Sequence, residues 1–160
     1  MTTDTPKPQT VAVRVLCDFA AKAGDLDLRF TPAPTARQGQ AGHVWLGSQQ
    51  PAPYETEVPL QGTWQHLTVR GRADGYCPTA NRLDEFKTHR GDLARQPANH
   101  RALHWAQAKA YGWLLCHSRG LAAIDVSLVY LDVATQQATR LTQTCQATEL
   151  ADHFNTLCAR

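Results

Sequence analysis

Two carboxylates and a lysine stand close together in the middle of the chain, in the stretches RGRADGY (70–76) and RLDEFKTHR (82–90). Asp74 belongs to the first stretch, and Glu85 and Lys87 belong to the second. If the stretches form neighbouring strands, the carboxylates can converge on one ion, and such hard oxygen ligands suit Mg²⁺ or Mn²⁺. Lys87 follows Glu85 by two residues, so strand alternation places both on one face. The spacing predicts a divalent cation site with an ammonium group beside it.

Such a site has the chemistry for phosphodiester hydrolysis. A bound cation neutralises charge that develops on the phosphate and acidifies a water molecule. The ammonium group of Lys87 can position the attacking water and offset charge on the scissile phosphate. Phe86, between the two site residues of its strand, is expected to point the other way into the core. The spacing by itself is common, so solvated charges at a strand edge are the alternative interpretation.

The elements that position these residues follow from periodicity and turn signals. Residues 11–23 fit either a strand or a short helix. Thr35 can cap a helix over 36–49, which three glycines weaken. The turn-like QGTW separates the first two of three strands that alternation of apolar and polar residues predicts. These strands are 54–60, 66–76 and 81–89.

The second half of the chain contains the clearest helix, residues 100–120, with Gly120 as its stop signal. Its apolar face consists of Leu103, Ala106, Ala110, Trp113 and Leu114. An adjoining stripe consists of His100, His104, Gln107 and Tyr111. Strands 124–134 and 138–147 and a final helix 148–159, capped by Thr148, complete the pattern. The sum is an α/β domain with a mixed central sheet flanked by helices.

Composition limits the class of protein. A chain of 160 residues with 42% hydrophobic and 19% charged residues suits one soluble globular domain. No apolar run approaches the roughly 18 residues that a membrane span needs. Residues 1–10, MTTDTPKPQT, lack the features of a secretory signal and are expected to be a disordered lead-in, which favours a cytoplasmic location.

The five cysteines are widely scattered, and no C-x-x-C pair occurs. Zinc and iron–sulfur sites need closely paired ligands. We therefore expect free thiols, without disulfides and without an iron–sulfur cluster.

Positive charge collects after the candidate site. The formal net charge is only +2, but residues 87–119 carry a single acid, Asp92, among six basic side chains. These are Lys87, Arg90, Arg95, Arg101, Lys109 and Arg119. A phosphate backbone is a natural partner for such a segment, and a solvated basic face is the alternative. Arg95, Arg101 and Lys109 are the candidates for contacts with DNA.

The chain resembles the PD-(D/E)XK nuclease superfamily in GRAD with Asp74, in LDEFK with Glu85 and Lys87, and in Q-x-x-x-Y with Gln107 and Tyr111. GQAGH (39–43) is similar to the histidine-bearing helix that precedes these motifs in the RecB-like branch. The resemblance covers residues 35–135 and implies a restriction-endonuclease-like fold. The segment 89–115 also looks like the nuclease domain fused to the front of DinG/XPD-type superfamily 2 helicases.

The resemblance implies a role for each matching residue. Asp74 and Glu85 would bind Mg²⁺ or Mn²⁺, with His43 as a third ligand and the carbonyl of Phe86 as a fourth. Lys87 would be catalytic.

Two residues of the long helix complete the implied site. Gln107 and Tyr111 would contact nucleic acid or organise the site, although each is an ordinary helix residue when taken alone. The chain departs from the family where Gln38 and Gln40 replace an acid often found in the first helix, which would lower metal affinity.

The expected activity is that of a metal-dependent DNA nuclease. It would cut single-stranded or flapped DNA in repair or processing, with residues 11–160 as a single nuclease domain excised from a longer chain that carries a C-terminal helicase. Two alternatives stay open, a DNA-binding module of nuclease fold that no longer cuts and an interaction domain with an accidental motif.

Overall fold

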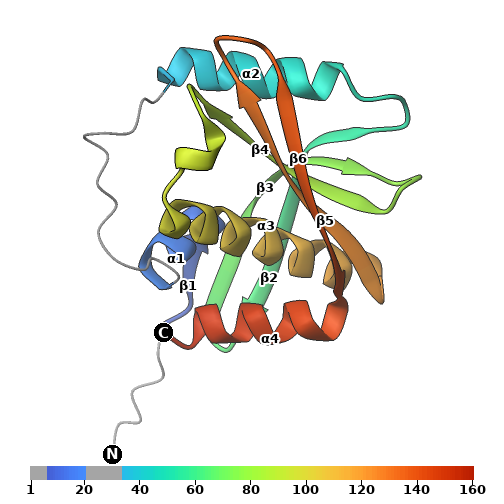
Figure 1. The fold of residues 1–160 in the computed structure, drawn as a ribbon. Coiled ribbons are helices and arrows are strands. Elements are labelled where there is room, and N and C mark those ends of the chain that lie inside the picture. Colours follow the sequence, from blue (N-terminus) through green and yellow to red (C-terminus); the bar gives the residue numbers. More distant parts are fainter. Residues whose placement is uncertain (1–6, 21–33) are drawn as a thin grey trace, which may run out of the picture.

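The computed structural model describes residues 7–20 and 34–160 of the chain (Figure 1). In chain order its elements are β1 (Gln9–Ala12), α1 (Val13–Ala20), α2 (Ala36–Ser48), β2 (Glu55–Trp64), β3 (Leu67–Cys77), β4 (Arg82–His89), the 3₁₀ helix η2 (Leu93–Arg95), α3 (Ala98–Arg119), β5 (Ala123–Asp132), β6 (Ala138–Gln146) and α4 (Ala147–Cys158).

The strands form one six-stranded sheet in the order β1-β3-β4-β5-β6, with β2 along the other edge of β3. The pairs β1–β3 and β4–β5 are parallel, whereas β2–β3, β3–β4 and β5–β6 are antiparallel. A parallel pair needs a crossover, and α3 supplies it between β4 and β5. The predicted class, an α/β fold with a mixed central sheet flanked by helices, is confirmed.

One edge of β3 is shared by two short partners. β1 pairs with residues 67–70, and β4 pairs only with residues 75–77. Between them, residues 71–74 of β3 have no strand beside this edge in the described part of the chain. We call the opening between β3 residues 71–74 and the diverging strand β4 the fork.

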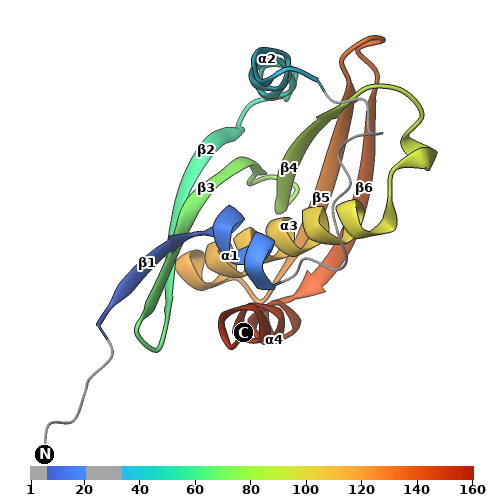
Figure 2. The ribbon, with the colours of Figure 1, turned by 90° about the vertical axis from the view of Figure 1, so that its left-hand side faces the viewer.

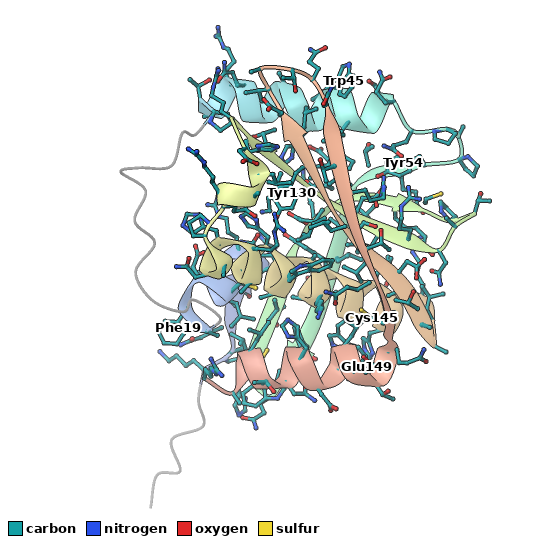
Figure 3. The ribbon with its side chains drawn as sticks, viewed as in Figure 1. Phe19, Trp45, Tyr54, Tyr130, Cys145 and Glu149 are labelled. Atoms are coloured by element: carbon teal, nitrogen blue, oxygen red, sulfur yellow. The ribbon has the colours of Figure 1, made fainter. Side chains whose placement is uncertain are left out.

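Helices cover both faces of the sheet. On the inner face, α1, α3 and α4 pack together through a large apolar cluster, and α3 lies inside the curve of the sheet (Figures 1 and 2). Fully buried members of this cluster include Val13, Val69, Leu83, Leu114, Val126 and Leu150. Side chains fill the space between these layers (Figure 3). Burial of each such side chain stabilises the fold by about 1.5–3 kcal/mol.

On the outer face, α2 packs over β4 and β5. The contact is made by Leu46, Phe86, Val129 and Leu131. Thr35 caps α2 as predicted, with a reciprocal bond to Gln38 that satisfies two backbone N–H groups. Gly42 of α2 faces Thr88 of β4, and a Cβ at this position would lie only 2.6 Å from Cγ2 of Thr88. The helix can therefore lie close to β4.

The hairpin turn lies later than the sequence indicates. QGTW (61–64) was expected to form it, but these residues belong to β2, and Gln65 and His66 make the turn. Gln65 has a left-handed φ of 51°, which a tight turn needs. Gly62 is buried between exposed neighbours, so strand alternation continues through a segment whose composition is typical of a loop.

Three other boundaries also differ. Residues 11–23, which fitted a strand or a helix, contain the end of β1 and all of α1, and residues 21–23 lie outside the described chain. Gln9 and Thr10, expected in the lead-in, belong to β1, and residues 1–6 are outside the description. Thr148 does not cap α4, whose N-cap is Gln146. The main chain passes directly from β6 into α4, and the N–H of Ala147 donates to the carbonyl of Ala122 instead.

Candidate active site

Asp74 stands at the fork, where β3 loses its pairing with β4. Its Oδ2 accepts a 2.7 Å hydrogen bond from the backbone N–H of Phe86, and its Oδ1 is 3.3 Å from Nδ1 of His43 on α2. The close packing of α2 on β4 brings His43 to this position, where its ring also meets the Phe86 ring edge to face. The structure thus brings together the predicted residues of three elements.

Glu85 points to the inner face and is buried, with 7% of its surface exposed. Its Oε2 has no hydrogen-bond partner among the described residues. Burial and the nearby Asp74 carboxylate raise the pKa of Glu85 to about 8, whereas Lys87 acts to lower it. A buried carboxylate oxygen without a partner is costly, so this atom needs either a proton or a cation.

Lys87 lies on the same face as Glu85, as strand alternation predicts. Its Nζ donates a 2.7 Å hydrogen bond to Oε1 of Gln107 on α3 and is 3.5 Å from Oε1 of Glu85. Gln107 is itself buried, with 6% exposed. The amide of Gln107 therefore holds the ammonium group beside the carboxylate.

Tyr111 lies one turn further along α3 and approaches β3 at the fork. A Cβ on Gly71 would lie 2.7 Å from the Tyr111 hydroxyl, so the absence of a side chain at Gly71 permits this contact. Burial and the carboxylates of Glu85 and Asp74 raise the pKa of Tyr111. Tyr111 thus stays protonated and can donate a hydrogen bond at the site.

The donor set fits a hard divalent cation. The two carboxylates are hard oxygen ligands that suit Mg²⁺ or Mn²⁺, and the imidazole of His43 suits a transition metal such as Mn²⁺ better than Mg²⁺. The carbonyl of Phe86 leaves β4 on the same side as its N–H and so points into the fork. Within the described ranges, however, no three His, Cys, Asp or Glu side chains are already gathered as a cation site. The unpaired and buried Oε2 of Glu85 is the observation that fits a cation at this place.

A cleft of about 560 Å³ opens over the fork on the outer face. Helix α2 and strand β2 form its walls, and Asp74 and Phe86 lie in it. Val44 on α2 also lines the cleft and is 70% exposed. The cleft opens the fork to solvent on this face.

Glu57 on the rim of this cleft was not predicted as a site residue. It lies opposite Asp74, between the pairs Thr56–Gly75 and Val58–Ala73. Its left-handed φ of 49° is uncommon for residues other than glycine. Its carboxylate is exposed and lies 3.8 Å from the guanidinium of Arg72. Correct placement of the turn would have shown its position opposite Asp74.

The other predicted residues divide between two places. His104 on the predicted stripe faces the sheet, where its Nδ1 is 2.8 Å from the Tyr130 hydroxyl. Arg101 lies over the Tyr130 ring. Arg95 is exposed on η2, at the same end of α3. Lys109 instead lies over Trp105, on the side of α3 opposite Gln107. The structure does not bring Lys109 to the fork.

Comparison with known proteins reaches only the level of the fold. A scan against protein-family models finds no match, and a search of curated proteins finds none. Among solved structures, the chain is similar to SSO0001 with a TM-score of 0.55 and 19% identity, over 99% of this chain and 79% of that one. It is also similar to a phage-related exonuclease from Haemophilus somnus 129PT, with a TM-score of 0.47 and 14% identity over 92% and 76%.

Among the described helices, none contains an apolar stretch that could span a lipid bilayer. The described cysteines, Cys17, Cys77, Cys116, Cys145 and Cys158, are all free thiols, and all are buried.

Proposed function

We propose that the protein is a metal-dependent nuclease that hydrolyses phosphodiester bonds of DNA. The observation that carries the proposal is the arrangement at the fork, where Asp74 and the buried Glu85 approach each other from neighbouring strands and Lys87 stands beside Glu85. A purely structural role would require a proton on Glu85, whose raised pKa permits one, whereas a bound cation would neutralise both carboxylates at once.

Asp74, Glu85, His43 and the Phe86 carbonyl would hold the cation. Mg²⁺ or Mn²⁺ at this place would neutralise charge on the phosphate and lower the pKa of a bound water. The missing acid of the first helix, where Gln38 and Gln40 stand, predicts weak binding of the cation.

The side chains of the inner face have separate tasks. Lys87 offsets negative charge on the phosphate and orients the attacking water, and the hydrogen bond to Gln107 keeps its ammonium group in place. Tyr111 donates a hydrogen bond at the mouth of the fork. Arg95 and Arg101, near the N-terminal end of α3, add contacts to the phosphate backbone. Lys109 lies away from the fork and has no role in the proposal.

A narrower assignment rests on the sequence motifs. We propose that the fold is restriction-endonuclease-like and that the chain belongs to the RecB-like branch, because the motif residues Asp74, Glu85, Lys87, Gln107 and Tyr111 meet around one opening. From the sequence resemblance of residues 89–115, we also propose that the protein acts on single-stranded or flapped DNA together with a DinG/XPD-type helicase.

The test is cleavage of labelled DNA. Single-stranded, flapped and double-stranded oligonucleotides are incubated with the protein and magnesium, manganese or EDTA, and Glu85→Gln serves as a control that keeps size and burial. Cleavage that requires a divalent ion and is lost in the variant supports the proposal. Binding of DNA without cleavage in any metal would instead support a DNA-binding module, and neither binding nor cleavage would support an interaction domain.

A further inference from the structure

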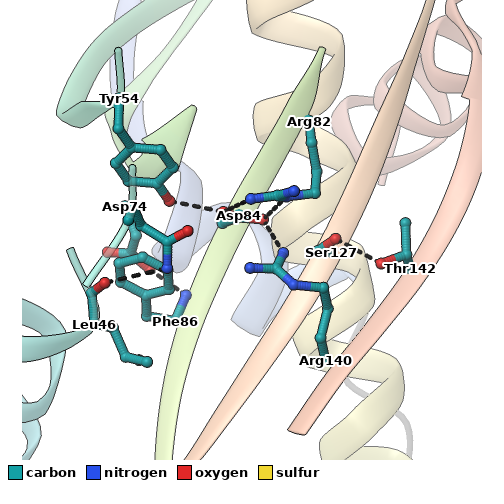
Figure 4. A network of polar contacts seen from close by, with 10 residues as sticks. Leu46, Tyr54, Asp74, Arg82, Asp84, Phe86, Ser127, Arg140 and Thr142 are labelled. Carbon is teal, nitrogen blue, oxygen red and sulfur yellow. Dashed lines mark hydrogen bonds and ion pairs between the residues drawn. The ribbon is translucent and has the colours of Figure 1, made fainter. Parts of the chain in front are cut away.

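A second carboxylate, Asp84, is fully buried on the outer face beside the fork (Figure 4). Arg82 of its own strand donates to both carboxylate oxygens, at 2.8 and 3.2 Å. Arg140 reaches Oδ1 from β6, and the Tyr54 hydroxyl donates to Oδ2 at 2.7 Å. Asp84 therefore orients donors from three separate segments of the chain.

The cluster has more positive charge than Asp84 needs. One bidentate arginine and a hydroxyl would already pair a buried carboxylate. Arg140 adds a second cation, and no other acid among the described residues is paired with it. The side chains of Arg82 and Arg140 are 21% and 32% exposed, so both guanidinium groups have contact with solvent. The result is an excess positive charge with fixed orientation at the surface.

This cluster adjoins the candidate active site. Asp84 directly precedes Glu85, and its partner Tyr54 packs against Gly75, the neighbour of Asp74, where a Cβ would overlap the tyrosine hydroxyl. Figure 4 shows the Tyr54 ring beside Asp74 with its hydroxyl directed toward Asp84, and both arginines on the other side of Asp84. A strand that enters the fork would therefore present its next phosphate to the arginines.

We propose that Arg82 and Arg140 form a binding site for a backbone phosphate of DNA, next to the phosphate that is cleaved. The choice of DNA as the ligand rests on the proposed function, but the binding of phosphate by the two arginines does not require the metal. Guanidinium groups bind phosphate oxygens through paired N–H donors, and Asp84 restricts their motion beforehand, which reduces the entropy lost on binding. Arg82 and Arg140 are thus positioning residues for the scissile strand.

The first test measures DNA binding in EDTA, where metal-dependent cleavage cannot contribute. Fluorescence anisotropy with a labelled single-stranded oligodeoxynucleotide compares wild type with Arg140→Gln, which leaves Asp84 its bonds to Arg82 and Tyr54. We expect affinity to fall about tenfold and the slope of log affinity against log salt to decrease by about one.

Arg119→Gln is the matched control. Arg119 also bonds to one carboxylate, through two 2.7 Å bonds to Glu55, but there the charges balance one to one. Affinity should stay close to that of wild type in this variant. Equal losses in Arg140→Gln and Arg119→Gln, or no loss in Arg140→Gln, would overturn the site.

Chemical protection tests the same point in the native protein, in case Arg140→Gln does not fold. Phenylglyoxal modification followed by mass spectrometry should show several-fold slower reaction of Arg82 and Arg140 when DNA is bound, and an unchanged rate at Arg119. Unprotected Arg82 and Arg140 would contradict the proposal.

The results also separate this site from the nuclease proposal. If wild type cuts DNA with manganese but Arg140→Gln binds and cuts equally well, the phosphate site is wrong and the nuclease proposal stands. If wild type never cuts but needs Arg140 for binding, the nuclease proposal is wrong, and Arg82 and Arg140 bind a DNA phosphate without a cleaved phosphate beside it.

Discussion

The backbone N–H of Phe86 donates a 2.7 Å hydrogen bond to Oδ2 of Asp74, although the pairing of their strands has already ended at Gly75 and Asp84. A side chain thus continues the contact between β3 and β4 where the backbone ladder stops. The bond ties Asp74 to the segment that carries Glu85 and Lys87. It explains how the two carboxylates can stay near each other at a fork that the sheet leaves open.

Loss of the Lys87 amine should affect the reaction much more than the binding of the cation. We expect Lys87→Ala to cut DNA at least about 100-fold more slowly, because the ammonium group acts on charge that develops in the transition state. Lys87→Arg should also cut slowly, since a planar guanidinium group cannot replace the compact ammonium group that is bonded to Gln107. Single-turnover cleavage measures both variants, with manganese calorimetry as the control. A near wild-type rate in Lys87→Ala would show that Lys87 has no catalytic role.

Gln107 should influence the reaction through Lys87. Gln107→Ala removes the acceptor of the 2.7 Å bond from the Lys87 ammonium group, so cleavage should slow. The free energy of unfolding should fall by about 1–3 kcal/mol because a polar partner is left unpaired. Leu114→Ala, at a fully buried position of the same helix, should cost about 2–5 kcal/mol without slowing cleavage by the folded protein. Chemical denaturation and cleavage assays measure the two effects. Equal cleavage rates in all three proteins would make Gln107 a purely structural residue.

Tyr111→Phe removes a hydroxyl but keeps the ring that packs near Gly71. We expect weaker DNA binding or slower turnover with little change in melting temperature. Anisotropy in calcium, which is chosen to occupy the site without supporting cleavage, measures the binding. Unchanged binding and turnover would indicate that the contact with Gly71 serves packing alone.

His104 should make the fold sensitive to acid. Burial lowers the pKa of His104 to about 3, and its Nδ1 lies 2.8 Å from the Tyr130 hydroxyl, which can donate to the neutral ring. Below the unfolded pKa of about 6.5, the unfolded chain binds a proton at His104 that the folded protein does not bind. The free energy of unfolding therefore decreases as the pH is lowered from about 6.5 to about 3, by up to about 1.4 kcal/mol per pH unit. Above about pH 6.5 both states are neutral, and His104 contributes no pH dependence.

The comparison of wild type with His104→Gln isolates this effect from the other histidines. Urea unfolding between pH 7 and 4.5 should show a shallower decline in the variant. Parallel curves for the two proteins would mean that the fold does not lower the pKa of His104.

Strand alternation made part of the site predictable from sequence. It placed Glu85 and Lys87 on one face and Phe86 on the other, and these positions are as predicted because β4 is a regular strand. The helix α2 was also predictable, since Thr35 and Gln38 form a local capping box. Local patterns of this kind depend only on residues close together in the chain.

Contacts between distant segments were not predictable in this way. The turn was predicted too early in the chain, so the sequence did not indicate that Glu57 of β2 lies opposite Asp74 of β3. The bond from Arg140 to Asp84 joins residues 56 positions apart, and nothing local in either strand indicates it. The helical stripe showed that His104 and Gln107 share a face, but only the packing of α3 shows that this face meets β4 and β5.

The central claim is that Asp74 and Glu85 bind one divalent cation together. Isothermal titration of the protein with Mn²⁺ tests it most directly, with Asp74→Ala, Glu85→Ala and the remote Asp92→Ala as a matched loss of charge. We expect one ion per wild-type chain and unchanged binding in Asp92→Ala. We expect no detectable binding in Asp74→Ala and Glu85→Ala, because water replaces a charged oxygen ligand poorly. Mn²⁺ affinity that is the same in Asp74→Ala and Glu85→Ala as in wild type would contradict the site.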